Sequence, residues 1–208
     1  MLIDLAVSFS FGYVLGSIPF GLVLVYLAMK QDIREIGSGN IGATNVLRTG
    51  RKGLALLTLL LDASKGAIAF FIVCLWLPPD SAALAGFGAV VGHCFPAWLR
   101  FSGGKGVATG IAVITAVLPS AGLFFIVSWL LVAALTRISS LSALLSFIAT
   151  GLFVTLGPVE SSGATQITIW GVGFLSWSRH KQNIRKILKG EESKISFRKN
   201  RPDQKSAR

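Results

Sequence analysis

Long apolar segments follow one another along almost the whole of this chain. They cover approximately residues 5–29, 53–77, 81–98, 107–136, 139–157 and 164–179. A helix needs about 20 apolar residues to cross a bilayer, within a range of roughly 17–25. The pattern therefore predicts an all-α, polytopic integral membrane protein with a single membrane-embedded domain over residues 1–190. We expect Pro19 to kink the first span.

The number of spans depends on the run 107–136, which is either one long kinked helix or two short helices that turn near Pro119-Ser120. With two helices, every Lys and Arg outside the spans falls on one side of the membrane. The opposite loops then carry only acidic charges, at Asp4, Asp80 and Glu160. With one helix, the cations from Arg179 to Arg208 would lie opposite the first basic loops, which the positive-inside rule disfavours. We therefore predict seven transmembrane helices, with the N-terminus outside and the C-terminus in the cytoplasm.

Composition agrees with a membrane protein. Of the 208 residues, 52% are hydrophobic and 14% are charged, and the mean hydropathy is +0.68. The formal net charge of +11 comes from cations beside the spans and in the tail 191–208, for which we predict a basic, disordered cytoplasmic segment. Such cations suit anchoring to anionic lipid rather than to nucleic acid. Cys74 and Cys94 lie in apolar surroundings, which indicates neither a disulfide nor a metal site.

Three polar, glycine-bearing blocks interrupt the apolar pattern, and all three fall on the predicted cytoplasmic side. The first block, Gly37–Lys52, contains glycines that favour a turn and the close approach of backbone N–H groups to an anion. Arg48 can grip a phosphate or a carboxylate with two hydrogen bonds. The other candidate binding residues of this block are Gly37, Ser38, Gly39, Asn40, Thr44 and Asn45. A capped interfacial loop with one snorkelling arginine is the alternative.

The second block, Gly92–Thr109, contains Gly103-Gly104-Lys105-Gly106 at the start of a predicted helix. Glycines, a cation and a helix N-terminus together favour a phosphate or oxyanion cradle. The segment is not a Walker A loop, because Lys105 is followed by glycine rather than by Ser or Thr. A flexible hinge with one lysine is the alternative. His93 is as consistent with a hydrogen-bonded structural role as with a catalytic one.

The third block, Arg179–Glu192, places His180 and Asn183 on one face of a helix, because they are three residues apart. His180 is a candidate proton acceptor or phosphate donor, and Asn183 a candidate to orient it or to bind a hydroxyl. Both are alternatively interfacial capping groups. Asp62 and Lys65, inside the second span, form an ionisable pair that we expect to support the polar loops.

Several types of catalytic site are absent from the sequence. There is no G-x-S-x-G nucleophile elbow, and neither histidine is followed by an acid five residues later, where Trp98 and Arg185 stand. Two isolated histidines and two apolar cysteines do not make a zinc site. We therefore predict chemistry without a metal or cofactor, based on positioning and charge stabilisation.

Together the blocks resemble the bacterial acyl-phosphate:glycerol-3-phosphate acyltransferase family. Gly37–Arg48 is similar to its first motif. Gly92-His93, Phe95-Pro96 and Gly103–Thr109 are similar to its second, and His180, Asn183-Ile184 and Gly190 to its third. Ser139-Ser140 also agrees, and the match covers about residues 5–192. Lys186 departs from the pattern, because an Arg is expected there.

The resemblance implies transfer of a fatty acyl group from acyl phosphate to the 1-hydroxyl of glycerol 3-phosphate, the first acylation step of phospholipid biosynthesis. It implies a multi-pass protein of the bacterial plasma (inner) membrane, with its active site at the cytoplasmic face and a functional link to an acyl-phosphate-producing enzyme. The implied catalytic residues are His180, Asn183, Lys105, Arg48 and Ser38. The implied substrate-binding residues are Gly37, Gly39, Asn40, Thr44, Asn45, Gly103, Gly104, Gly106 and Ser140. The base is either His180 or the donor's own phosphate.

Three other functions compete with this one. A transporter of phosphorylated solutes would need a polar path to the outer face, where the predicted loops are short and lack cations. A membrane scaffold would have no use for so dense a set of polar and cationic groups. An acyltransferase that uses acyl-CoA or acyl carrier protein would need a larger cytoplasmic surface than these loops offer.

Overall fold

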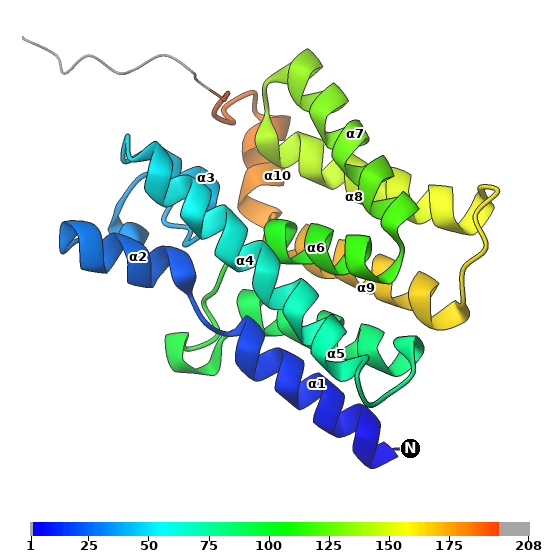
Figure 1. Ribbon diagram of the computed structural model, residues 1–208. Coiled ribbons are helices and arrows are strands. Elements are labelled where there is room, and N and C mark those ends of the chain that lie inside the picture. The colour runs from blue at the N-terminus through cyan, green and yellow to red at the C-terminus, as the bar shows by residue number, and fades with distance from the viewer. Residues whose placement is uncertain (1, 196–208) are drawn as a thin grey trace, which may run out of the picture.

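The computed structural model describes residues 2–195, and within them every regular element is helical. Figure 1 shows these helices packed into one body. The helices longer than one turn are α1 (Leu2–Gly16), α2 (Phe20–Met29), α3 (Ala43–Leu47), α4 (Lys52–Val73), α5 (Pro79–Cys94), α6 (Val107–Val117), α7 (Pro119–Thr136), α8 (Ser139–Leu156), α9 (Gly163–Arg179) and α10 (Lys181–Leu188). Two single-turn 3₁₀ helices, Ile33–Glu35 and Ala97–Leu99, lie in the loops.

The first apolar segment is broken rather than kinked. α1 ends at Gly16 and α2 begins at Phe20, so the expectation of one helix bent at Pro19 is wrong. Pro19 has no N–H to donate, and its ring excludes the preceding turn from a continuous helix. The break leaves the backbone carbonyl of Ile18 available to a side chain from another helix, and Lys65 of α4 donates to it at 2.9 Å.

α5 is the central helix of the body, and it packs against α1, α4, α6 and α9. Its contact with α1 is very close, because a Cβ on Gly12 or Gly16 would overlap the backbone carbonyls of Ala85 and Ala89. Small residues let helix backbones approach in this way where lipid offers no hydrophobic driving force. The rigid support for the second polar block is therefore α5, held on several sides.

The run 107–136 forms two helices, as the charge distribution predicts. α6 ends at Val117, Leu118 is extended, and α7 begins with Pro119 at its first position. Proline suits the first turn of a helix, where its missing N–H has no intrahelical partner. α6 has only 11 residues, so it is the shorter member of the pair.

Five helical segments among the described residues are long and apolar enough to cross a membrane. They are Leu2–Met29, Lys52–Val73, Pro79–Leu99, Pro119–Thr136 and Ser139–Leu156. The predicted total of seven spans also needs α6 and α9, which are shorter, so the total stays a prediction.

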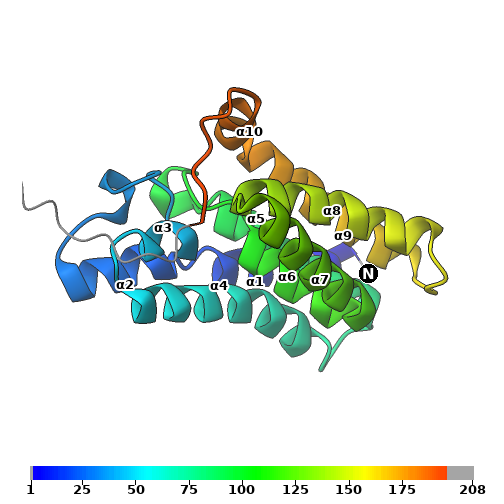
Figure 2. The same cartoon turned by 90° about the horizontal axis from the view of Figure 1, so that it is seen from above.

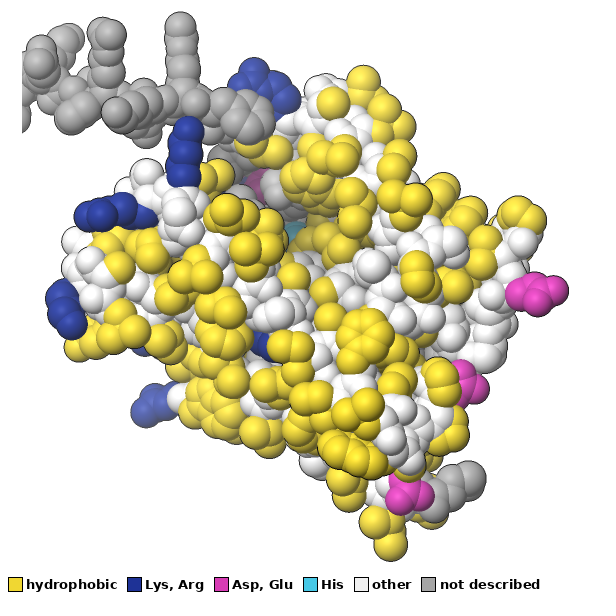
Figure 3. All heavy atoms as spheres, in the orientation of Figure 1, with side chains coloured by type: hydrophobic (Ala, Val, Ile, Leu, Met, Phe, Trp, Pro, Cys, Tyr) yellow, Lys and Arg dark blue, Asp and Glu magenta, His cyan; other side chains and the backbone are white. Residues whose placement is uncertain are grey.

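Charged side chains divide between the two ends of the body. Figure 3 shows most Lys and Arg side chains at the end where α2, α3 and the chain beyond α10 lie, and most acidic side chains at the opposite end. Asp4 and Asp80 belong to the first turns of α1 and α5. Apolar side chains cover much of the surface between the two ends, as expected of a surface that faces lipid.

Candidate active site

Asn45 organises the first polar loop. Its side-chain Oδ1 accepts the N–H of Ser38 at 2.9 Å, and its Nδ2 donates to the carbonyls of Ile36 and Asn40, both at 2.8 Å. The side chain is 2% exposed. The expectation that Asn45 donates to a substrate does not agree with this geometry, because its polar atoms are already used within the loop.

The glycines of the first loop have a conformation that other residues rarely adopt. Gly37 and Gly39 have φ angles of +58° and +70°, in the left-handed region where a Cβ is strained. A Cβ on Gly37 would also lie 2.5 Å from Asn45 Oδ1 and 2.9 Å from Arg48 Cδ. Gly37 therefore lets the Arg48 side chain lie directly against the turn. The glycines act through the shape of the loop.

Four other residues of the first block remain at or near the surface. Ser38 and Thr44 are exposed, and their hydroxyls have no hydrogen-bond partner within residues 2–195. Asn40 is half-buried, and its Oδ1 accepts the N–H of Gly42 at 2.8 Å. Arg48 donates from Nη2 to Ser193 Oγ at 2.6 Å, so the guanidinium reaches the chain that follows α10.

The second loop comprises residues 95–106, between α5 and α6. Its glycines Gly103 and Gly104 are hydrogen-bonded through both their N–H groups and their carbonyls. The N–H groups of Gly103 and Gly104 donate to the carbonyls of Cys94 and His93, at 3.1 and 2.9 Å. Their own carbonyls accept from Arg179 at the end of α9. The expectation that these two N–H groups bind a phosphate is therefore wrong for this geometry. Gly106, with φ +77°, ends the loop and caps α6.

A buried ionic cluster lies beneath the second loop. Lys65 Nζ lies 2.8 Å from Asp62 Oδ1 and 2.9 Å from His93 Nδ1. A Cβ on Gly104 would overlap His93 Nε2, so this glycine lies flat against the imidazole ring. The position of His93 indicates structural support of the loop, one of its two open interpretations. Asp62 and Lys65 contact each other, and Lys65 contacts His93. The pair therefore supports the polar loop, as the sequence predicts.

His180 lies between α9 and α10, and it is 2% exposed. Its Nδ1 is 2.7 Å from the carbonyl of Ser176. A carbonyl can only accept, so Nδ1 carries the proton, and Nε2 of the neutral ring carries a lone pair. Burial, followed by the positive charge of Lys105, lowers the pKa of His180 to about 4. His180 is thus an uncharged hydrogen-bond acceptor at neutral pH.

The carboxylate of Glu192 is hydrogen-bonded to a side chain of the third block. Glu192 Oε1 accepts from Asn183 Nδ2 at 2.6 Å and from Ser140 Oγ at 2.8 Å. Asn183 and Ser140, predicted to contact substrate, are therefore joined through this acid. α10 and α8 are neighbours in the fold. Figure 2 shows α10 projecting from the helical body.

Cations from all three blocks influence Lys105. Burial lowers the pKa of Lys105 to about 8, the charge of Glu192 raises it, and Arg48, Lys186 and Arg179 lower it. Hydrogen bonds agree with this proximity, because Arg48 donates to Ser193, the neighbour of Glu192, and Arg179, directly before His180, donates to the carbonyl of Gly104, directly before Lys105. Parts of all three blocks therefore meet at one place in the structure. Among residues 2–195, no group of three His, Cys, Asp or Glu side chains is placed to hold a metal ion.

Comparison with known proteins identifies the family. The glycerol-3-phosphate acyltransferase family matches residues 6–190. A protein of that name from Paramagnetospirillum magneticum is 53% identical over 190 residues, which cover 90% of this chain and 92% of the relative. The chain belongs to the glycerol-3-phosphate acyltransferase family. Another member, from Gluconobacter oxydans, is 51% identical over 187 residues, 88% of this chain and 89% of the relative.

Two crystal structures of the family member PlsY (YgiH), an integral membrane enzyme, share the fold. The glycerol 3-phosphate form has a TM-score of 0.86 at 35% identity, and covers 92% of this chain and 96% of that one. The lysophosphatidic acid form has a TM-score of 0.83 at 34% identity, and covers 92% and 95%. As a glycerol-3-phosphate acyltransferase, the chain is an integral membrane enzyme of phospholipid biosynthesis.

Two residues of the candidate site are not among those predicted from the sequence. Arg179 was counted only as a charge, although it binds both glycine carbonyls of the second loop. Glu192 was assigned to the tail, although it bridges Ser140 and Asn183. The sequence does offer a signal for Glu192, an acid within a strongly basic segment. Residues 196–208, the rest of the predicted tail, lie outside the described residues.

Proposed function

We propose that this chain transfers a fatty acyl group from acyl phosphate to the 1-hydroxyl of sn-glycerol 3-phosphate. The products are 1-acyl-sn-glycerol 3-phosphate and inorganic phosphate. The observation that carries the proposal is the meeting of the three blocks. Arg48 donates to Ser193 beside Glu192, Glu192 accepts from Asn183, and Arg179, directly before His180, donates to the loop that carries Lys105. Both substrates bring a phosphate to one place, so a site that joins them needs several cations to offset their mutual repulsion.

His180 suits the hydroxyl rather than a phosphate. Its Nδ1–H is committed to the Ser176 carbonyl, so only Nε2 is free, and Nε2 accepts. A substrate hydroxyl donates to this atom and is oriented by it. With a pKa of about 4, the imidazole is a weak base at neutral pH, whereas a phosphate monoester has its second pKa at about 6. We therefore assign the final proton to phosphate.

The proposed reaction balances without a covalent intermediate between substrate and enzyme. The 1-hydroxyl oxygen bonds to the acyl carbon, and the bond between that carbon and the phosphate oxygen breaks. The hydroxyl proton passes to the departing phosphate, while Lys105 and Arg48 compensate for its negative charge. The donor is already activated, so positioning and charge stabilisation supply the catalysis. Ser38 and Thr44 are available to bind phosphate oxygens, because their hydroxyls are exposed.

The proposal includes the placement of the site in the bacterial plasma membrane. We assign seven spans, an outer N-terminus, a cytoplasmic C-terminus and a cytoplasmic active site. Support comes from the cationic end of the body (Figure 3), which contains the loops of the site, and from the acidic opposite end. The positive-inside rule places such an end in the cytoplasm. A soluble enzyme that makes acyl phosphate would supply the donor on that side.

Purified protein tests the donor directly. It would receive radiolabelled glycerol 3-phosphate with palmitoyl phosphate, palmitoyl-CoA or palmitoyl-acyl carrier protein in separate reactions. We expect labelled lysophosphatidic acid from palmitoyl phosphate alone, and none from a Lys105→Ala variant that folds normally. Product from a thioester in place of acyl phosphate would overturn the donor assignment. Absence of product from every donor, in a folded sample, would refute the proposed reaction.

A further inference from the structure

Arg179 joins two of the three polar blocks. It is the last residue of α9, directly before His180. Its Nε donates to the carbonyl of Gly104 at 3.1 Å, and its Nη2 donates to the carbonyl of Gly103 at 3.0 Å. The guanidinium carbon also lies 5.0 Å from the centre of the Phe95 ring, within the range of a cation–π contact.

The second loop is also bonded to the segment around α1, because Tyr13 donates to the Phe95 carbonyl and Trp98 donates to the Ser17 carbonyl, both at 2.8 Å. Neither of these bonds reaches α9. The loop's N–H groups, at Gly103 and Gly104, bind the end of α5 from which the loop itself emerges. These bonds fix the loop to its own helix and leave its position relative to α9 open. Within the described residues, the two hydrogen bonds from Arg179 are the polar link between this loop and α9, which ends directly before His180.

We propose that Arg179 is a positioning residue for acyl transfer, because it sets the place of Lys105 relative to His180. The proposal rests on the function proposed above, in which Lys105 stabilises phosphate and His180 orients the hydroxyl. Lys105 follows Gly104 directly, and His180 follows Arg179 directly, so one pair of hydrogen bonds determines how the two side chains face each other. A displacement of about 1 Å between reacting groups can lower a rate about 100-fold.

The geometry requires an arginine and not only a positive charge. A guanidinium is planar, offers two parallel N–H donors and stacks on an aromatic ring, whereas an ammonium is a compact point charge. A lysine at position 179 would keep the charge near Lys105 but would lose the two-point contact and the stacking on Phe95. If charge alone mattered, lysine would be an adequate replacement.

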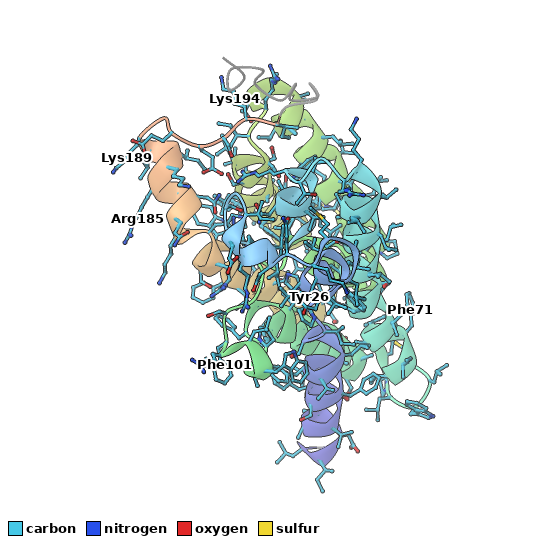
Figure 4. All side chains as sticks on the ribbon, turned by 90° about the vertical axis from the view of Figure 1, so that its left-hand side faces the viewer. Tyr26, Phe71, Phe101, Arg185, Lys189 and Lys194 are labelled. Atoms are coloured by element: carbon cyan, nitrogen blue, oxygen red, sulfur yellow. The ribbon has the colours of Figure 1, made fainter. Side chains whose placement is uncertain are left out.

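The test compares Arg179→Lys and Arg179→Met with matched changes at Arg185. Arg185 is an exposed arginine on α10, and Figure 4 shows its side chain directed away from the other helices. We expect both Arg179 variants to lower kcat by about 100-fold and to raise KM for glycerol 3-phosphate. Arg185→Lys and Arg185→Met leave both constants unchanged. Nearly normal kinetics in Arg179→Lys would overturn the proposal.

Hydrogen exchange provides a measurement that does not need activity. Peptides covering residues 101–108 report the N–H groups of Gly103 and Gly104, which are hydrogen-bonded in the wild type. We expect faster exchange in this segment in both Arg179 variants, and wild-type exchange in α1 and α4. Unchanged exchange over 101–108, or faster exchange throughout all helices, would refute a local positioning role. A wild-type protein that lacks acyl transfer would refute the proposed function instead, and the exchange data would still test the Arg179 contact.

Discussion

Replacing Gly104 by Ala tests how the second loop rests on the buried cluster. The new Cβ would overlap Nε2 of His93 and lie 2.8 Å from its Cε1 and 2.9 Å from its Cδ2. The nearest ring atom, Nε2, lies closer still to this Cβ, whereas non-bonded heavy atoms in contact lie about 3.5–4.0 Å apart, so the methyl group and the ring must separate by about 1 Å or more. Either the loop or the imidazole has to move.

The loop is the part that moves. His93 is buried, and its Nδ1 lies 2.9 Å from Lys65 Nζ, so a shift of the ring would break a contact within an ion cluster. A shift of the loop breaks the hydrogen bond from the Gly104 N–H to the His93 carbonyl, worth about 1 kcal/mol, and displaces Lys105. We expect kcat to fall by up to about 100-fold, because Lys105 moves relative to His180. KM for glycerol 3-phosphate rises as well, because the displaced Lys105 binds phosphate less well.

Steady-state kinetics of the purified variant would measure this effect. Gly53→Ala is the matched control, since no atom lies within 4 Å of the position its Cβ would take. Its kinetic constants should equal those of the wild type. The reasoning would be refuted by a Gly104→Ala enzyme whose kcat and KM both stay within about twofold of the wild-type values, because a displacement of about 1 Å predicts a larger change in rate.

Three further predictions concern buried and charged groups. Lys65→Met should lower the free energy of unfolding in detergent by about 3–5 kcal/mol, since a buried carboxylate loses its partner, whereas exposed Lys52→Met should not. The pKa of Lys105 is about 8, so kcat/KM should decline as the pH rises through 8 and the ammonium loses its charge. The pKa of His180 is about 4, so kcat/KM should show no second decline near neutral pH. A profile that stays flat well above pH 8 would contradict the first assignment. Glu192→Gln should move the alkaline decline to lower pH, because the charge of Glu192 raises the pKa of Lys105, and a shift to higher pH would show that the acid acts otherwise.

The order of the helices could be predicted from the sequence, because the length of each apolar segment and the charges that flank it are properties of that segment alone. The division of 107–136 at Pro119 follows from both. The break between α1 and α2 did not follow, because a proline in an apolar run is compatible with either a kink or a break. What stabilises the break is a tertiary contact, the bond from Lys65 to the Ile18 carbonyl, which no local pattern reveals.

The polar blocks were located correctly in the chain, but the roles within them could not be assigned from residue type. Asn45 and the N–H groups of Gly103 and Gly104 are hydrogen-bond donors by residue type. In the structure they donate to backbone carbonyls and stabilise the loops. Whether a donor faces a substrate or its own backbone depends on its neighbours in three dimensions. The role of Glu192 could not be predicted either, because it depends on Ser140 of α8 and Asn183 of α10, which meet only in the folded chain.

Glu192 also has a consequence for how the protein is made. It follows Arg48 and Lys105 in the order of synthesis, because translation runs from the N-terminus. Until the ribosome has added Glu192, a nascent chain lacks the acid that raises the pKa of Lys105. We therefore expect the cations of the first two blocks to be inserted before the charge that compensates them is made.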